Sequence, residues 1–157
     1  ISALNLIKNW NLSADSSNTA AALAIIVLPN AFNEDDLKYE TGAITRKLVE
    51  TIDYLENKFG RIDVPLGKVL RLVRGETNLP LSGGPGLLRA IYFNKKNDTY
   101  VGIAGDCYFQ AVEWGPNGEL NAWTIHQYGS ATAIESSIHY DDQAKLFSKH
   151  EMKQVRP

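Results

Sequence analysis

The apolar segment from Ala20 to Leu28 constrains the fold more than any other part of the sequence. All nine of its residues are alanine, leucine, isoleucine or valine, and Pro29 follows directly. Ser16 and Ser17 precede it, and serine before an apolar run that ends at proline is typical of a helix. Because a helix that is apolar on every side must be buried, the segment predicts a central, buried helix. It is much shorter than the roughly 20 residues that span a bilayer, so we expect no membrane span.

Two amphipathic helices are predicted on either side of this segment. In residues 1–10 an apolar residue recurs every three positions, and from about Ala43 to Phe59 apolar residues recur at helical spacing before Gly60. The residues that form these two stripes are Ile1, Leu4, Ile7, Trp10, Ile44, Leu48, Ile52, Leu55 and Phe59. Together, the helices at 1–10 and 20–28 carry more apolar surface than the predicted strands can cover. We therefore expect an exposed apolar patch on them.

The pattern changes from helix to strand and turn after Gly60, where glycine and proline punctuate short apolar runs. Three runs predict strands, at residues 87–94, 100–114 and 119–129. The sequence GPNG at residues 115–118 suits a tight turn, so the last two runs are predicted to form an antiparallel hairpin. The first run is predicted to join them as a third strand.

The end of the chain predicts a short helix from Tyr140 and then a surface strand or arm at residues 150–157. Helices first, then an antiparallel strand meander and a terminal helix, is the order of an α+β fold. We predict a single region over residues 1–157, with a helical part at 1–60 and a strand-rich part at 61–157.

Charge and cysteine content exclude several classes of function. The formal net charge is -2, which gives no attraction to phosphate backbones or anionic lipid, so we expect neither nucleic acid nor membrane as a partner. Cys107 is the single cysteine, which excludes an internal disulfide and a cysteine-based zinc site. No basic and apolar leader is present, so we expect no signal peptide here and interpret Ile1 as a processed or excised end.

A polar segment near the C-terminus contains the residue types of Ser-His-Asp catalysis. Ser130 is the candidate nucleophile, with His126 or His139 as base. Asp141 or Asp142 is the candidate orienting acid. The sequence YGSAT lacks the G-x-S-x-G turn of hydrolase nucleophiles. We favour a structural interpretation, in which a strand leads into a Gly-Ser turn and then a helix cap.

A metal site is a further hypothesis, because imidazoles and carboxylates ligate zinc. Its candidate ligands are His126, His139, Asp141, Asp142 and His150. Their spacing matches no known ligand pattern, so we expect no metal and no cofactor.

Two other features have a functional and a structural interpretation. Residues 79–90, LPLSGGPGLLRA, resemble a phosphate-binding loop, but Pro85 lacks an amide donor and no Lys-Ser or Lys-Thr follows, which favours a tight, packed turn. Asp106 lies in an apolar, strand-like context where a carboxylate is costly unless it is paired. Either it holds a loop by hydrogen bonds or it acts on a substrate.

Four segments of the chain resemble the C-terminal part of the β-subunit of penicillin amidase family acylases, and most of all the acyl-homoserine lactone and aculeacin acylases. They are residues 1–23, 79–92, 105–132 and 136–147. In the first of them, Asn11 stands where an aspartate is usual. The most specific element consists of His139, Tyr140, Asp142 and Gln143, and it follows the Gly-Ser turn at Gly129 and Ser130.

This resemblance implies an N-terminal-nucleophile hydrolase with a four-layered αββα sandwich, to which this chain contributes helices and part of a sheet. The family's nucleophile is a serine that uses its own α-amine as base, which is reasonable because an α-amine titrates near pH 8. The resemblance implies that this serine, the histidine after it and the oxyanion residues lie upstream, so no catalytic residue is assigned in this chain. Its implied partners are the α-subunit, the N-terminal part of the β-subunit and a small-molecule amide, in the periplasm or secreted.

Two alternatives remain open from the sequence: a non-catalytic module that binds a partner through its apolar helices, and an independent serine hydrolase that uses Ser130 and His126. If the motif is structural, at least one side chain among His139, Tyr140 and Asp142 is expected to bond the backbone where the turn meets the terminal helix.

Overall fold

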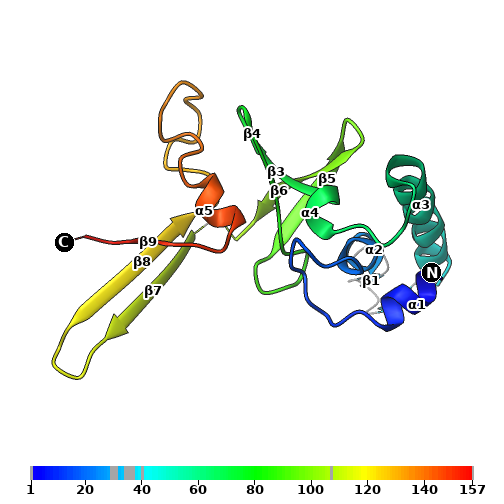
Figure 1. Ribbon diagram of the computed structural model, residues 1–157, viewed down its shortest axis with the longest axis horizontal. Coiled ribbons are helices and arrows are strands. Elements are labelled where there is room, and N and C mark those ends of the chain that lie inside the picture. The colour runs from blue at the N-terminus through cyan, green and yellow to red at the C-terminus, as the bar shows by residue number, and fades with distance from the viewer. Residues whose placement is uncertain (1, 29–31, 34–37, 40, 107, 157) are drawn as a thin grey trace.

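The computed structural model describes residues 2–28, 32–33, 38–39, 41–106 and 108–156. Its first half comprises α1 (Ala3–Lys8), α2 (Ala21–Val27), the short strands β1 (Phe32–Asn33) and β2 (Lys38–Tyr39), α3 (Thr41–Phe59) and α4 (Leu66–Val69). Its second half comprises β3 (Leu70–Arg74), β4 (Thr77–Pro80), β5 (Ile91–Lys96), β6 (Thr99–Gly105), β7 (Tyr108–Trp114), β8 (Leu120–His126), α5 (Ala144–Ser148) and β9 (Lys153–Gln154). The predicted α+β order of helices, strands and a terminal helix is confirmed (Figure 1). The predicted single antiparallel meander is wrong, because β5 and the β7–β8 pair belong to different sheets and β3 pairs parallel with β6. No described helix is both long and apolar enough to cross a bilayer.

Helix α2 is the centre of the core, as its composition predicts. All of its residues are buried, and α1, α3 and α4 contact it. Its start differs from the prediction, because Ala20 is the N-cap residue and Asn18, not Ser16 or Ser17, bonds the backbone there. The Asn18 Oδ1 atom accepts hydrogen bonds from the backbone N–H of Ala20 and Ala21 at 2.9 and 3.0 Å. A side-chain acceptor at this place satisfies donors that have no partner inside the helix.

A four-stranded sheet lies beside the helices, in the order β4-β3-β6-β5. Strands β3 and β4 pair antiparallel, β3 and β6 pair parallel, and β5 and β6 pair antiparallel. The predicted β5–β6 pairing is confirmed, and Asn97 and Asp98 turn the chain with φ of 44° and 61°. The β3–β4 hairpin was not predicted from the sequence.

A three-stranded sheet in the order β7-β8-β9 forms the other end of the molecule. The β7–β8 hairpin and the C-terminal strand are confirmed. The single strand predicted over residues 100–114 is wrong, because β6 and β7 belong to different sheets. The chain changes direction at Gly105, where φ is 137° and a Cβ atom would lie 1.9 Å from the carbonyl oxygen of Ala90. Only glycine accepts both conditions.

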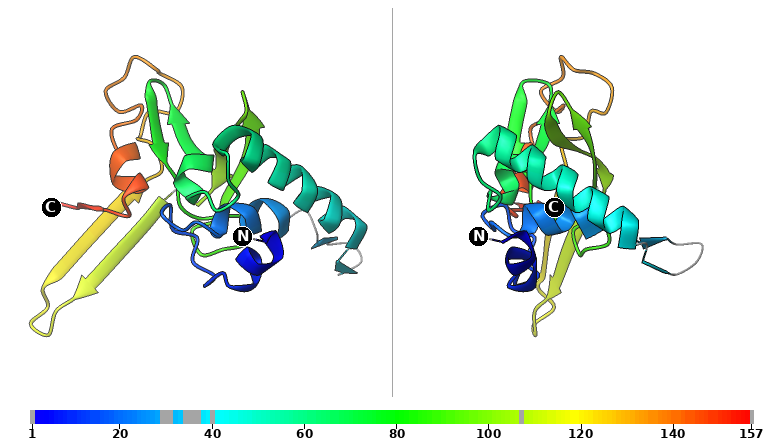
Figure 2. Two further views of the ribbon diagram at one scale, coloured as in Figure 1. Left: turned by 45° about the vertical axis from the view of Figure 1, so that its right-hand side comes forward. Right: turned by 90° about the vertical axis from the view of Figure 1, so that its right-hand side faces the viewer.

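The β7–β8 hairpin projects away from the rest of the molecule, as the views in Figure 2 show. Its strands leave Tyr108, Val112, Trp114 and Leu120 exposed. The apolar patch expected on the helices at residues 1–10 and 20–28 is present only in part, because α2 is buried while Leu4 on α1 is 68% exposed and Leu28 is 40% exposed. Exposed apolar side chains also lie outside the hairpin, among them Leu12, Leu88 and Ile138.

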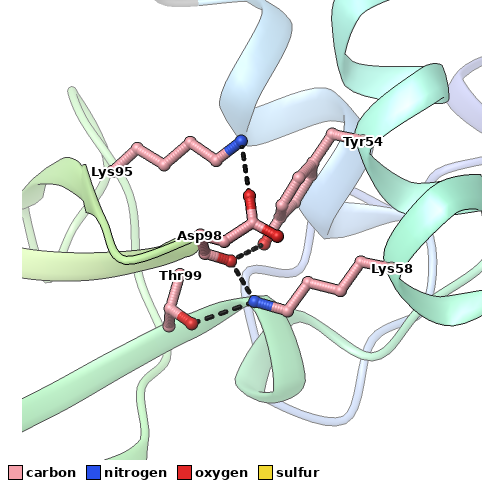
Figure 3. Close-up of polar contacts among 5 residues, drawn as sticks. All are labelled: Tyr54, Lys58, Lys95, Asp98 and Thr99. Carbon is pink, nitrogen blue, oxygen red and sulfur yellow. Dashed lines mark hydrogen bonds and ion pairs between the residues drawn. The ribbon is translucent and has the colours of Figure 1, made fainter.

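Polar contacts fasten α3 to the β5–β6 turn (Figure 3). The backbone oxygen of Asp98 accepts hydrogen bonds from Lys58 Nζ and from the Tyr54 hydroxyl, the latter at 3.1 Å. Lys58 Nζ also donates to Thr99 Oγ1 at 2.9 Å, and Lys95 Nζ pairs with the Asp98 carboxylate at 2.8 Å. The turn is thus held against the long helix by side chains from both elements.

Candidate functional site

The loop between β8 and α5 closes on itself through backbone contacts. Ala131 N donates to the carbonyl oxygen of His139 at 3.0 Å, and Gln143 N donates to that of Tyr128 at 2.7 Å. A Cβ atom at Gly129 would lie 2.1 Å from the same His139 oxygen. The loop therefore has room only for glycine where its two ends meet.

The buried side chain of Gln143 ties this loop to the strand before it. Its Oε1 atom accepts a hydrogen bond from the backbone N–H of His126 at 3.0 Å. The expected side-chain contact to backbone is thus made by Gln143, whereas His139, Tyr140 and Asp142 were expected to supply it. Gln143 is therefore a structural residue, because its buried side-chain oxygen is already occupied by the hydrogen bond from His126 N.

Arg74 at the end of β3 holds the loop from the other side. Its Nη2 atom donates to the carbonyl oxygens of Ala131 and Thr132 at 3.2 and 2.7 Å. Its guanidinium carbon lies 3.8 Å from the ring centroid of Tyr140 and 4.9 Å from that of Tyr128. Sequence reasoning missed Arg74 because it missed the β3–β4 hairpin. The sequence feature that could have predicted this hairpin is the run LRLVRG at residues 70–75, in which Arg74 directly precedes Gly75.

The candidate Ser-His-Asp residues do not assemble into a triad. His139 Nδ1 lies 2.9 Å from Asp142 Oδ2, which is the base and acid geometry of such a site. Ser130 is exposed, however, and among the described hydrogen bonds none joins it to a histidine. His126 packs its ring against Tyr108 instead, with centroids 5.0 Å apart. A base with its acid but without a nucleophile cannot begin acyl transfer.

The metal hypothesis also lacks a structural basis. Among the residues that the structure describes, no group of three histidine, cysteine or acidic side chains could hold an ion. Asp141 accepts a hydrogen bond from the Thr77 hydroxyl, while His150 lies beside Arg89 in a separate cleft. The five candidate ligands are thus distributed over different contacts.

The glycine-rich loop at residues 79–90 is a packed turn, as favoured from the sequence. Gly83 has φ of 103°, and a Cβ atom there would lie 2.4 Å from the carbonyl oxygen of Arg89. Asp106 fixes the end of this loop, because its carboxylate accepts from Ala90 N at 2.7 Å and its own N–H donates to Ala90 O at 2.9 Å. The structural interpretation of Asp106 is therefore supported.

A cleft that sequence reasoning did not predict lies where β7, β8 and α5 meet. Its volume is about 330 Å³, and Phe109, Ile125 and Phe147 form much of its wall. Arg89 is its largely buried cation, and burial lowers the pKa of this guanidinium to about 10. Burial, together with the nearby Arg89 charge, also lowers the pKa of His150.

Comparison with known families gives a match over nearly the whole chain. The family model for penicillin amidase matches residues 2–156. No curated protein matches the sequence. The matched range includes the β8–α5 loop, the glycine-rich turn and both sheets, so the elements described above are elements of that family.

Proposed function

The chain belongs to the penicillin amidase family, and we propose that it is the C-terminal part of the β-subunit of an N-terminal-nucleophile acylase. Members of this family hydrolyse amides. The proposed reaction is cleavage of a linear amide between an acyl chain and an amine-bearing head group. Acyl-homoserine lactones and penicillin-like compounds are the proposed substrate class, from the resemblance of the loop and its flanking segments.

The observation that carries this proposal is the β8–α5 loop, which is closed by backbone hydrogen bonds. It lies in a chain that matches the family over residues 2–156. Gly129, Gln143 and Arg74 use their contacts to hold backbone, and no described hydrogen bond joins the His139 imidazole to a serine hydroxyl. Such a loop supports a fold and does not perform acyl transfer. We assign this chain a scaffold role within the acylase, and the attacking serine, its α-amine and the oxyanion donors to other segments.

Exposed apolar surface is consistent with cover by those other segments. Trp114 and Leu120 on the β7–β8 hairpin are 73% and 63% exposed, and contiguous exposed apolar side chains commonly mark interaction surfaces. The proposed partners are the α-subunit and the N-terminal part of the β-subunit. In the complete enzyme the two sheets would then form part of an αββα sandwich, located in the periplasm or secreted.

The proposal is tested by comparing the 157-residue chain with the longest natural polypeptide that contains it. Both are incubated with acyl-homoserine lactones and with chromogenic phenylacetyl amides, and the released amine is measured. We expect turnover from the longer protein after maturation and none above buffer from the chain alone. Turnover by the chain that Ser130→Ala abolishes would instead identify an independent serine hydrolase. A parent gene that starts near Ile1, with an inactive product, would identify a non-catalytic module.

A further inference from the structure

Arg89 is a largely buried cation without an acidic partner. Among the described residues no carboxylate forms an ion pair with it. Its Nη2 atom donates to the carbonyl oxygen of Phe147, and its guanidinium carbon lies 3.9 Å from the centroid of the Phe147 ring. Its Nε atom is buried and has no hydrogen-bond partner. A buried charge is costly unless an opposite charge and hydrogen bonds compensate it, so this site lacks an anion.

Arg89 remains charged at neutral pH, so it cannot relieve this cost by losing its proton. Burial lowers its pKa to about 10, which is still well above neutrality. The guanidinium is also held in place, because it donates to the carbonyl oxygen of Phe147 and stacks on the Phe147 ring. The charge is therefore presented at one place in the cleft wall.

Apart from His150 and Glu151, the side chains that line the cleft beside this charge are apolar. Phe109 from β7, Ile125 from β8 and Phe147 from α5 line it, with Leu88 and Met152 at its sides. Ile125 and Phe147 are 4% and 2% exposed, so packing holds these walls in place. Its volume of about 330 Å³ lies at the lower end of the roughly 300–1,000 Å³ of small-molecule sites, which combine apolar walls with few polar groups.

We propose that this cleft binds a small monocarboxylate with a hydrocarbon body. The carboxylate would pair with the Arg89 guanidinium, and the hydrocarbon would lie against Phe109 and Phe147. Guanidinium and carboxylate groups form charge-assisted hydrogen bonds, and removal of the hydrocarbon from water also favours binding. This inference does not depend on amide hydrolysis by the family.

Three other titratable groups lie close to the cleft and define the charge that a ligand meets. The Asp15 Oδ1 atom accepts from the backbone N–H and hydroxyl of Ser17 at 2.8 and 2.7 Å, and Asp15 forms no described ion pair with Arg89. Burial and Arg89 lower the pKa of His150, so its ring is neutral at pH 7. Glu151 lines the cleft without an ion pair to Arg89. Among the described residues, the Arg89 guanidinium therefore has no carboxylate paired with it.

Binding is tested by isothermal titration calorimetry of the chain with sodium octanoate, and with octanamide as a neutral probe of the same length. We expect octanoate to bind at least about tenfold more tightly than octanamide, the ratio expected for one charge-assisted pair. Arg89→Gln should remove this preference, whereas Arg46→Gln on the exposed face of α3 should retain it. Leu88→Ala changes a side chain that is 98% exposed, so the fold should remain and octanoate binding should weaken about two- to threefold.

Several results would overturn the proposal. These are absence of octanoate binding, equal binding of octanoate and octanamide, or an unchanged preference in a folded Arg89→Gln protein. If circular dichroism shows that Arg89→Gln does not fold, the proposal is still tested by comparing the affinities of the unaltered chain for octanoate and octanamide. Binding to the chain but not to the longest natural polypeptide that contains it would show that an acidic protein segment fills the cleft, which would overturn the assignment to a small molecule.

Discussion

Arg74 stacks on Tyr140, with its guanidinium carbon 3.8 Å from the centroid of the ring. The same guanidinium donates to the carbonyl oxygens of Ala131 and Thr132. One side chain at the end of β3 therefore holds two distant parts of the β8–α5 loop. Because this loop leads from the three-stranded sheet to α5, Arg74 connects the two sheets of the molecule.

Replacing Arg74 should destabilise the fold. Arg74→Met keeps an unbranched apolar stem but removes the donors and the charge, so we expect the free energy of unfolding to fall by about 2–3 kcal/mol. Urea denaturation followed by circular dichroism measures it. Arg46→Met on α3 is the matched control and should change the value by less than about 0.5 kcal/mol. Equal effects of the two substitutions would show that the Arg74 contacts contribute nothing.

Gly129 and Gly42 should respond in opposite directions to alanine. A Cβ atom at Gly129 would lie 2.1 Å from the carbonyl oxygen of His139, so Gly129→Ala must displace backbone and should cost at least about 2 kcal/mol. At Gly42 in α3 the nearest atom is the end of the Arg46 side chain at 3.8 Å. Gly42→Ala should therefore be neutral or stabilising by up to about 1 kcal/mol. A thermal melt of each variant decides, and a tolerated Gly129→Ala would contradict the described loop.

The helices were predictable because their signals are local. The apolar run of α2 and the 3.6-residue spacing of α3 depend on neighbouring residues alone, and both helices are present. The partition of strands between sheets was not predictable, because it depends on contacts between distant residues. The turn at Gly105 is required by its approach to Ala90, which no property of residues 100–114 reveals.

The contacts of the candidate site could also be predicted only in part from the sequence. The sequence favoured a Gly-Ser turn between a strand and a helix cap, and in the structure β8 leads through this turn and a loop closed by backbone hydrogen bonds to α5. The loop is held by Arg74, which is far away in sequence and belongs to a hairpin that alternation alone did not identify. The cleft at Arg89 was also not predictable, since its walls come from three elements that meet only in the folded chain.

Stability should decrease at alkaline pH partly through Tyr54. Burial, and secondly the Asp98 charge, raise the pKa of this phenol above its ordinary value of 10.0. Above about pH 10 the unfolded chain loses this proton while the folded chain keeps it, so the free energy of unfolding falls as pH rises. Tyr54→Phe should make that decline shallower, as measured by urea denaturation between neutral and alkaline pH. Part of the decline remains, because burial also raises the pKa of Tyr100 and Tyr128. An unchanged slope in Tyr54→Phe would contradict this assignment.

The last prediction concerns the hairpin that projects from the molecule. Trp114 and Leu120 lie opposite each other in the β7–β8 register and are 73% and 63% exposed. Each square ångström of apolar surface removed from water contributes roughly 25 cal/mol, so covering this pair by a second copy is favourable when the chain is made alone. We expect self-association in sedimentation velocity and increased fluorescence of a hydrophobic probe. The double substitution of Trp114→Thr and Leu120→Thr keeps residues that favour strands, and it should give a monomer that does not increase the fluorescence of the probe. The control variant Leu4→Gln on α1 should self-associate as the unaltered chain does. A compact, stable monomer of the unaltered chain would instead favour an autonomous domain over a piece of a larger enzyme.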